Sequence, residues 1–155
     1  MAAGGLTMSG FGDVFITVFA DASHCPRTLA TGVGFWMKYT DKQGVVQTLT
    51  GSNSYRDVKY PHLAELLGLE FALENVAEHV DCAQKILVLQ CDNRWALSNI
   101  KLPSEMAQNL KGYKAKWVKG HQGNKNARSY VNGVCDKLAG QAMRRVRDEI
   151  DSGDC

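Results

Sequence analysis

The sequence contains no apolar run of the roughly 20 residues that crossing a membrane requires. Its first ten residues, MAAGGLTMSG, also lack the charged start and the apolar centre of a secretory signal peptide. Both absences argue against a membrane-spanning or a secreted protein. We interpret residues 1–10 as a flexible leader that precedes the folded part of the chain.

Cysteine is present, but in a pattern that argues against two common uses. The number of cysteines is odd, so they cannot all pair in a disulfide framework, and no two of them have the Cys-x-x-Cys spacing of a zinc site. The sequence therefore predicts a reduced chain in the cytoplasm. The five cysteines are Cys25, Cys82, Cys91, Cys135 and Cys155.

The 155 residues, of which 45% are hydrophobic and 22% charged, suit one globular domain with a substantial core. We place this domain at residues 11–150, followed by a frayed tail at residues 151–155. The net charge of +2 hides an uneven distribution, because residues 101–128 contain seven of the 18 basic residues and one of the 16 acidic ones. Such a run is often only a solvated surface, but beside a site it favours contact with a phosphate backbone.

The stretch Val14–Ser23, VFITVFADAS, predicts a central strand because both of its alternating faces are apolar. The apolar run ends in Asp21, which small and polar residues follow, and a carboxylate there is costly to bury unless a cation or hydrogen-bond donors meet it. The simpler interpretation is that Asp21 only caps a turn. The segments Gly32–Tyr39 and Val45–Ser52 follow with short connections, which predicts an antiparallel meander.

A second acid lies on a helix predicted from Pro61 to about His79. Glu65 is in line with Leu69, Ala72 and Val76, so its side chain points along the apolar side of that helix. It either reaches water at the edge of the apolar stripe or takes part in a site.

A third acid, Asp92, directly follows a second buried strand, Lys85–Cys91, so two strands end in the same way. Strand, meander, helix and strand in this order predict an α/β fold with a mixed sheet. A last strand is expected at Tyr113–Lys119 and a mobile loop at Gly120–Val131. The fourth acid, Asp136, is expected in the first turn of the final helix, where the helix dipole alone would also favour a carboxylate.

The four acids Asp21, Glu65, Asp92 and Asp136 thus occupy comparable places, at strand ends and on helices packed against them. Converging carboxylates repel one another unless divalent cations lie among them, and ligand sets made only of oxygen favour Mg²⁺ or Mn²⁺. Two such ions about 4 Å apart can activate a water and stabilise the leaving oxygen of a phosphodiester. The pattern therefore indicates metal-dependent chemistry on nucleic acid.

Four motifs occur along the chain in order: ITVFADAS, AELLGLEFALE, ILVLQCDN, and KWVKGHQG followed by N-x-x-CDKLAGQA. Together they closely resemble the type 1 ribonuclease H family, from about Val14 to Met143. The resemblance implies the ribonuclease H-like fold, a five-stranded mixed β-sheet flanked by α-helices, without the long basic handle of some bacterial enzymes. It also implies that the four acids hold two Mg²⁺ ions, with Mn²⁺ as a possible substitute. On the same likeness, His121 assists proton movement or product release.

The activity that the resemblance implies is endonucleolytic cleavage of the RNA strand of RNA–DNA hybrids, leaving 5′-phosphate and 3′-hydroxyl ends. We expect a monomer. Ser23 and Asn93 are expected to contact the hybrid at the edge of the site, and Lys114, Lys116 and Lys119 to hold phosphates of the DNA strand.

Two departures from the family's pattern leave the substrate open. The loop after Asp21 is SHCPRTLATGVG in place of a segment rich in glycine and asparagine, and the approach to Glu65, KYPHLAE, lacks the family's asparagines. One alternative is therefore a nuclease directed at DNA, such as a junction resolvase. Another is a non-catalytic nucleic-acid-binding module, although a binder of polyanions gains nothing from clustered carboxylates. We interpret the three tryptophans, Trp36, Trp95 and Trp117, as core or half-buried packing residues rather than base-stacking platforms.

Overall fold

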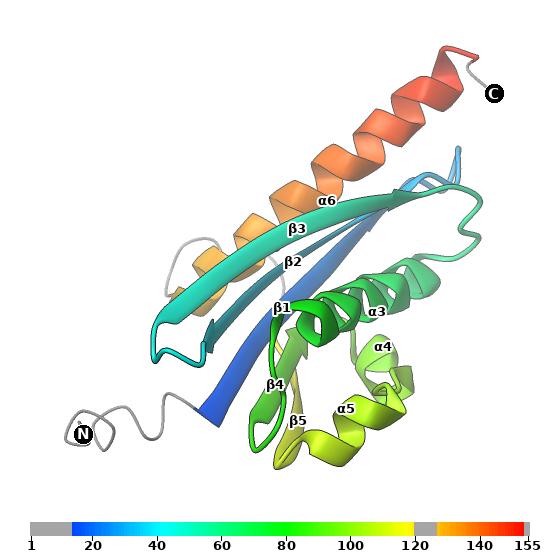
Figure 1. The fold of residues 1–155 in the computed structure, drawn as a ribbon. Coiled ribbons are helices and arrows are strands. Elements are labelled where there is room, and N and C mark those ends of the chain that lie inside the picture. Colours follow the sequence, from blue (N-terminus) through cyan, green and yellow to red (C-terminus); the bar gives the residue numbers. More distant parts are fainter. Residues whose placement is uncertain (1–13, 120–126, 154–155) are drawn as a thin grey trace, which may run out of the picture.

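The computed structural model describes residues 14–119 and 127–153. Its centre is a five-stranded sheet in the order β3-β2-β1-β4-β5, with helices on both faces (Figure 1). The strands are β1 (Phe15–His24), β2 (Thr31–Thr40), β3 (Val46–Tyr55), β4 (Ile86–Cys91) and β5 (Gly112–Trp117). The helices are α3 (Pro61–His79), α4 (Arg94–Asn99), α5 (Ser104–Asn109) and α6 (Ala127–Asp151). The predicted α/β class and the five-stranded mixed sheet are confirmed.

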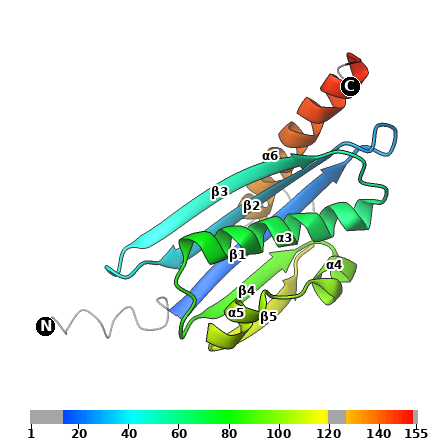
Figure 2. The same ribbon diagram turned by 45° about the vertical axis from the view of Figure 1, so that its right-hand side comes forward.

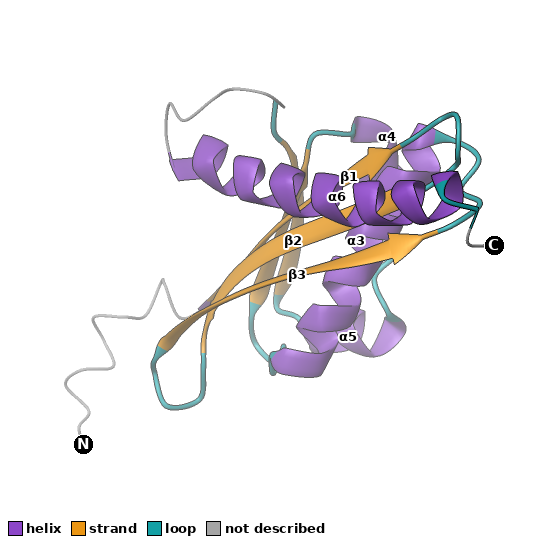
Figure 3. Cartoon of the chain, turned by 90° about the horizontal axis from the view of Figure 1, so that it is seen from above, coloured by secondary structure: helices purple, strands orange, loops and turns teal. Residues whose placement is uncertain are grey.

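The middle strand is β1, as its two apolar faces predict. It pairs antiparallel with β2 and parallel with β4, and β4 pairs parallel with β5. Helices α3, α4 and α5 lie on one face of the sheet (Figure 2), and α6 lies on the other (Figure 3). The larger core is on the α3 side, where Ile16, Val18 and Ala20 are buried. A smaller cluster on the α6 side contains Phe19 and Cys135.

Helix α3 lies close against β1 beside Asp21. The helix begins at Pro61, a position where the missing N–H of proline has no helical partner to lose. At Gly68 a Cβ atom would lie 3.2 Å from the carbonyl oxygen of Asp21, so this glycine allows the helix to approach the strand closely. Glu65, one turn earlier, is thereby brought to the end of β1.

Helix α6 begins earlier than the sequence predicts. Residues 127–131, expected in a loop, are helical, because Val131 and Cys135, one turn apart, both pack in the cluster with Phe19. These contacts hold a turn that contains Gly133, a poor helix former. Asp136 therefore lies in the third turn, where the helix dipole no longer explains a carboxylate. The rest of the predicted loop, residues 120–126 with His121, lies outside the described residues.

The close contact between α6 and β2 depends on Gly34. A Cβ atom there would lie 2.7 Å from the carbonyl oxygen of Cys135 and 2.8 Å from the Cβ atom of Leu138. No flexible side chain can move aside, because the nearest atom belongs to the helix backbone. The absence of a side chain at Gly34 thus sets the position of α6, and with it that of Asp136.

We therefore expect Gly34→Ala to destabilise the protein by about 1–3 kcal/mol, the usual cost of overpacking. Gly133→Ala is the matched control, since a Cβ atom at Gly133 on α6 meets nothing within 4 Å. This control should stabilise the protein by about 0.5–1 kcal/mol through helix propensity. Thermal unfolding of both variants is the measurement. A Gly34→Ala variant that melts with the parent would contradict the described packing of α6.

Candidate active site

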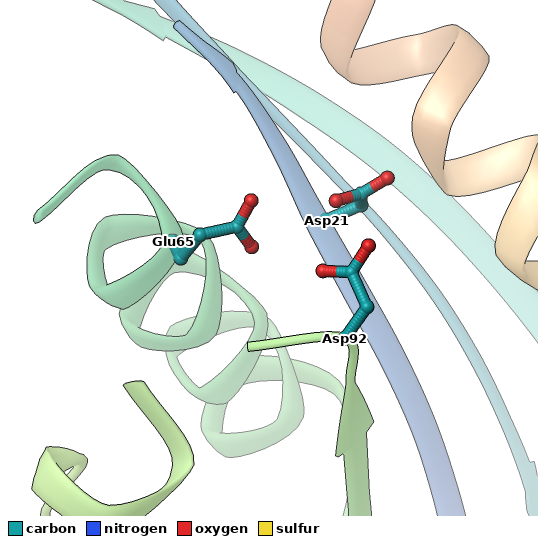
Figure 4. A group of neighbouring side chains, drawn as sticks. All are labelled: Asp21, Glu65 and Asp92. Atoms are coloured by element: carbon teal, nitrogen blue, oxygen red, sulfur yellow. The ribbon is translucent and has the colours of Figure 1, made fainter. Parts of the chain in front are cut away.

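Three of the four predicted ligands meet at one end of the sheet. Because β1 and β4 are parallel neighbours, with Phe19 opposite Gln90, their following acids Asp21 and Asp92 come to the same edge. Glu65 points toward them from α3 (Figure 4). One carboxylate oxygen from each of the three residues lies within 4.8 Å of the other two. This is a ligand set made only of oxygen and small enough to surround a divalent cation.

The negative charges of the carboxylates in this cluster are poorly compensated by the surrounding protein. Asp21 is only 5% exposed. Burial first, and then the charge of Asp92, raise the pKa of Asp21 to about 8, although the Ala22 N–H donates a hydrogen bond to Asp21 Oδ1 at 2.9 Å. Burial and the charges of Asp21 and Asp92 raise the pKa of Glu65 to about 9. The protein thus holds carboxylates where their negative form is unfavourable without a cation, which fits a metal site.

Asp136 lies beside this cluster rather than inside it. The like charge of Asp136 and a hydrogen bond between the Asp136 and Asp21 carboxyl groups both add to the raised pKa of Asp21. Asp136 itself is exposed on α6. Its neighbour Cys135 anchors the helix to β1, since the Cys135 thiol donates to the carbonyl oxygen of Phe19 at 3.5 Å. The helix therefore presents Asp136 at the open edge of the carboxylate group.

The residues predicted to bind nucleic acid lie in two places. Ser23 is half-buried, two residues beyond Asp21 on β1, and Asn93 directly follows Asp92. The Asn93 Oδ1 accepts from the backbone N–H of Ala96 at 2.8 Å and caps α4, and this cap does not use the Nδ2 group. Lys114 and Lys116 lie on β5, and Lys119 lies just beyond that strand. Lys114 and Lys119 are exposed and Lys116 is half-buried.

An aromatic group that the sequence patterns did not single out flanks the carboxylates. The rings of Tyr60 and His62 are stacked at 5.6 Å, and the His62 ring meets Trp95 edge-on at 4.6 Å. His62 precedes Glu65 by three residues on α3, and Trp95 follows Asp92 by three. For His62 that spacing was a signal that could have revealed the group, because residues three apart on a helix share a face and both His62 and Glu65 are on α3.

Trp117 holds the segment that carries Asp92. The indole N–H of Trp117 donates to the Asp92 carbonyl oxygen at 3.1 Å, and the Arg94 guanidinium lies 4.1 Å above the Trp117 ring. Trp95 and Trp117 are each 42% exposed, more open than a packing role predicts. Trp36 is half-buried against the cluster of Phe19, as that role does predict.

Comparison with solved structures finds this fold in ribonuclease H domains. The N-terminal RNase H domain of a Mycobacterium tuberculosis protein is 16% identical, covers 88% of this chain and 99% of its own, and superposes with a TM-score of 0.63. RNase H1 of the archaeon Halobacterium salinarum is 16% identical, covers 84% and 98%, and gives a TM-score of 0.58. An RNase H1 isolated from compost, solved in complex with an RNA/DNA hybrid, is 17% identical, covers 84% and 98%, and gives a TM-score of 0.55.

No protein-family model matches the chain, and no curated protein sequence matches it either. The chain nevertheless has the ribonuclease H-like fold over most of its length. The family resemblance predicted from the motifs is confirmed at the level of that fold. Its carboxylate cluster of Asp21, Glu65 and Asp92 is a group that could hold a metal ion.

None of the helices in the described ranges has the length and apolar character that crossing a bilayer would require. The cytoplasmic location, the monomeric state and the domain limits at residues 11 and 150 stay predictions.

Proposed function

We propose that this protein is a metal-dependent endonuclease that cleaves the RNA strand of RNA–DNA hybrids. The observation that supports it is the cluster of Asp21, Glu65 and Asp92 oxygens within 4.8 Å of one another. The compost RNase H1 with the same fold was solved with an RNA/DNA hybrid, which supports the choice of substrate.

In this proposal Asp21, Glu65, Asp92 and Asp136 hold two Mg²⁺ ions, with Mn²⁺ as a substitute. When bound, such ions activate a water and stabilise the leaving oxygen of a phosphodiester, which leaves 5′-phosphate and 3′-hydroxyl ends. The chain's own task is to fix the ligands. Trp117 holds the Asp92 backbone, and Gly68 sets the distance between α3 and β1.

Around the ligands, other side chains position the substrate. Ser23 and the Nδ2 group of Asn93 supply hydrogen-bonding groups at the edge of the site. The exposed rings of Tyr60, His62 and Trp95 offer a surface for sugars and bases that does not depend on sequence. We therefore expect cleavage without strong sequence preference.

The test is a side-by-side digestion of four labelled substrates: RNA–DNA hybrid, duplex RNA, duplex DNA and a four-way DNA junction. Each is incubated with Mg²⁺, and again with EDTA. The proposal expects cleavage of the hybrid well above the others, with Mg²⁺ only. Preference for the junction or duplex DNA would support a DNA-directed nuclease instead, and binding without cleavage of any substrate would support a non-catalytic module.

His121→Ala is expected to lower the turnover of hybrid by roughly 10- to 100-fold, the usual effect of losing a general acid or base. The affinity for hybrid should change little, because the proposed role is proton movement or product release. Steady-state kinetics across pH 6–9 is the measurement. Turnover equal to that of the parent over this whole range would remove His121 from the mechanism.

A further inference from the structure

On the α6 side of the sheet lies a shallow hollow that the proposed cleavage site does not use. Its floor is formed by side chains of β1 and β4, and a lysine stands on each rim. The floor residues are Thr17, Phe19, Val88 and Gln90, and the rim residues are Lys38 on β2 and Lys116 on β5. Among the described residues, helix α6 packs mainly against β1, β2 and β3 on this face of the sheet, and β4 and β5 lie beyond it.

The strand register places three lysines on this one face. Lys38 is opposite Thr17, Thr17 is beside Val88, and Val88 is beside Lys114. In the next row, Lys116 is beside Gln90. Strands are about 4.8 Å apart, so the backbones of Lys38 and Lys114 are about 14 Å apart across the hollow.

These lysines are available to a ligand. Lys38 and Lys114 are exposed and Lys116 is half-buried. Within residues 14–119 and 127–153, no carboxylate lies within ion-pair distance of any of the three. Two opposite rims of positive charge therefore face a floor without charge, which is complementary to a polyanion rather than to a single small anion.

The hollow also has an aromatic ring at its edge and lies close to the carboxylates. Trp36 lines it and meets Phe19 edge-on, with ring centroids 6.0 Å apart. Asp21 comes two residues after Phe19 on β1, which is about 6.7 Å further along the strand on the same face, and Asp92 directly follows the end of β4. A basic groove with an aromatic side chain is the combination that binds single-stranded nucleic acid.

We propose that this hollow binds a single-stranded stretch of nucleic acid that continues from the strand held at the carboxylates. Lys38, Lys114 and Lys116 contact its phosphates, and Trp36 stacks on a base. The inference rests on the proposed nuclease function, since the continuity with the carboxylates gives the strand a reason to be there. An acidic peptide would match the charge but would gain nothing from Trp36 or from the neighbouring site.

The test measures binding without cleavage. The full chain in EDTA is titrated against fluorescein-labelled dT12, by anisotropy, at several salt concentrations between 50 and 200 mM. Lys38→Glu should weaken binding by about 5- to 10-fold and lower the slope of log K against log salt by about 0.7 for each phosphate that the protein no longer neutralises. Lys116→Glu should act alike, and Trp36→Phe should reduce the quenching of protein fluorescence on binding.

Lys42→Glu is the control, because it makes the same charge change. Lys42 is exposed, and it lines a separate hollow together with His79 at the end of α3. The Lys42→Glu protein should bind dT12 with an affinity within 2-fold of that of the parent. Equal binding of dT12 by the parent, Lys38→Glu and Lys116→Glu would overturn the proposal, as would tighter binding of a labelled twelve-residue polyglutamate than of dT12.

The two proposals can fail separately. Loss of dT12 binding in Lys38→Glu, in a protein that cleaves none of the four substrates with Mg²⁺, would support the hollow and reject the nuclease. Cleavage of hybrid by a parent that binds dT12 no better than Lys38→Glu does would support the nuclease and reject the hollow.

Discussion

Asp92→Asn is expected to abolish Mg²⁺-dependent cleavage while leaving the metal-free protein as stable as the parent, or more stable. The asparagine keeps the shape of the side chain but removes one of the charges that raise the pKa values of Asp21 and Glu65. Relief of this repulsion is worth about 1 kcal/mol at the effective dielectric constant of a protein surface. Cleavage of labelled hybrid and thermal unfolding in EDTA are the two measurements.

Asp81→Asn is a suitable control for this variant. Asp81 is exposed beyond the end of α3, and its Oδ1 accepts from the Ala83 N–H at 3.1 Å, a bond that asparagine can keep. The rate at which the Asp81→Asn protein cleaves hybrid should match that of the parent. An Asp92→Asn protein that melts well below the parent in EDTA would mean that Asp92 is a structural cap, not a metal ligand.

The position of the carboxylate cluster could be predicted because it depends on short-range patterns. Two apolar strands that end in Asp21 and Asp92 must bring these residues together if the strands are parallel neighbours, as β1 and β4 are. Helical periodicity alone put Glu65 on the side of Leu69, Ala72 and Val76, all of which are fully buried. The order of the four motifs along the chain then fixed which segment corresponds to which strand or helix of the fold.

The start of α6 and the surroundings of Asp136 could not be predicted in this way. The first turns of α6 contain residues of low helix propensity, and they are held by contacts with Phe19, more than 100 residues earlier. The close approach at Gly34 is likewise a long-range contact, invisible in local periodicity. Helix propensity has only a weak influence on where a helix begins, and tertiary packing of this kind overrides it.

The surfaces around the cluster depend on which strands are neighbours. Lys38 and Lys116 come from strands that are far apart in sequence, and only the order β2-β1-β4-β5 places them on either side of one hollow. The grouping of Tyr60, His62 and Trp95 similarly needs α3 and α4 to start at the same end of the sheet. Sequence spacing identified the charges and rings, but the sheet order decided which of them could act together.

The metal-free protein is expected to lose stability as the pH rises from about 4 to 9. Asp21 and Glu65 have raised pKa values of about 8 and 9 in the folded state. Between their ordinary values near 4 and these raised values, the folded protein holds more protons than the unfolded chain, so its free energy of unfolding falls as pH increases. Because one pKa unit corresponds to about 1.4 kcal/mol, the loss is on the order of a few kcal/mol, or about 5–15 °C in Tm.

Mg²⁺ should reverse this loss, and Asp21→Asn should remove much of it. A cation that binds only the folded state stabilises it by about 2.7 kcal/mol at 100 times its Kd, and this gain should be larger at pH 8 than at pH 5, where the ligands hold protons. In Asp21→Asn the amide does not ionise, so Tm in EDTA should vary less with pH, and the response to Mg²⁺ should shrink. Thermal unfolding of both proteins from pH 5 to 9, with EDTA and with Mg²⁺, measures each effect.

Asp41→Asn separates this effect from a general response to pH. Hydrogen bonds from the Gln47 side chain and from the Val45 and Gln43 N–H groups lower the pKa of the Asp41 carboxyl group, so its stabilisation is lost only as the pH falls below its ordinary range. The Asp41→Asn protein should have a lower Tm than the parent at neutral pH. Between pH 5 and 9, its Tm in EDTA should change with pH as steeply as that of the parent. If the parent's Tm in EDTA stays level or rises over that range, the carboxylates are not held against their charge and do not require a cation among them.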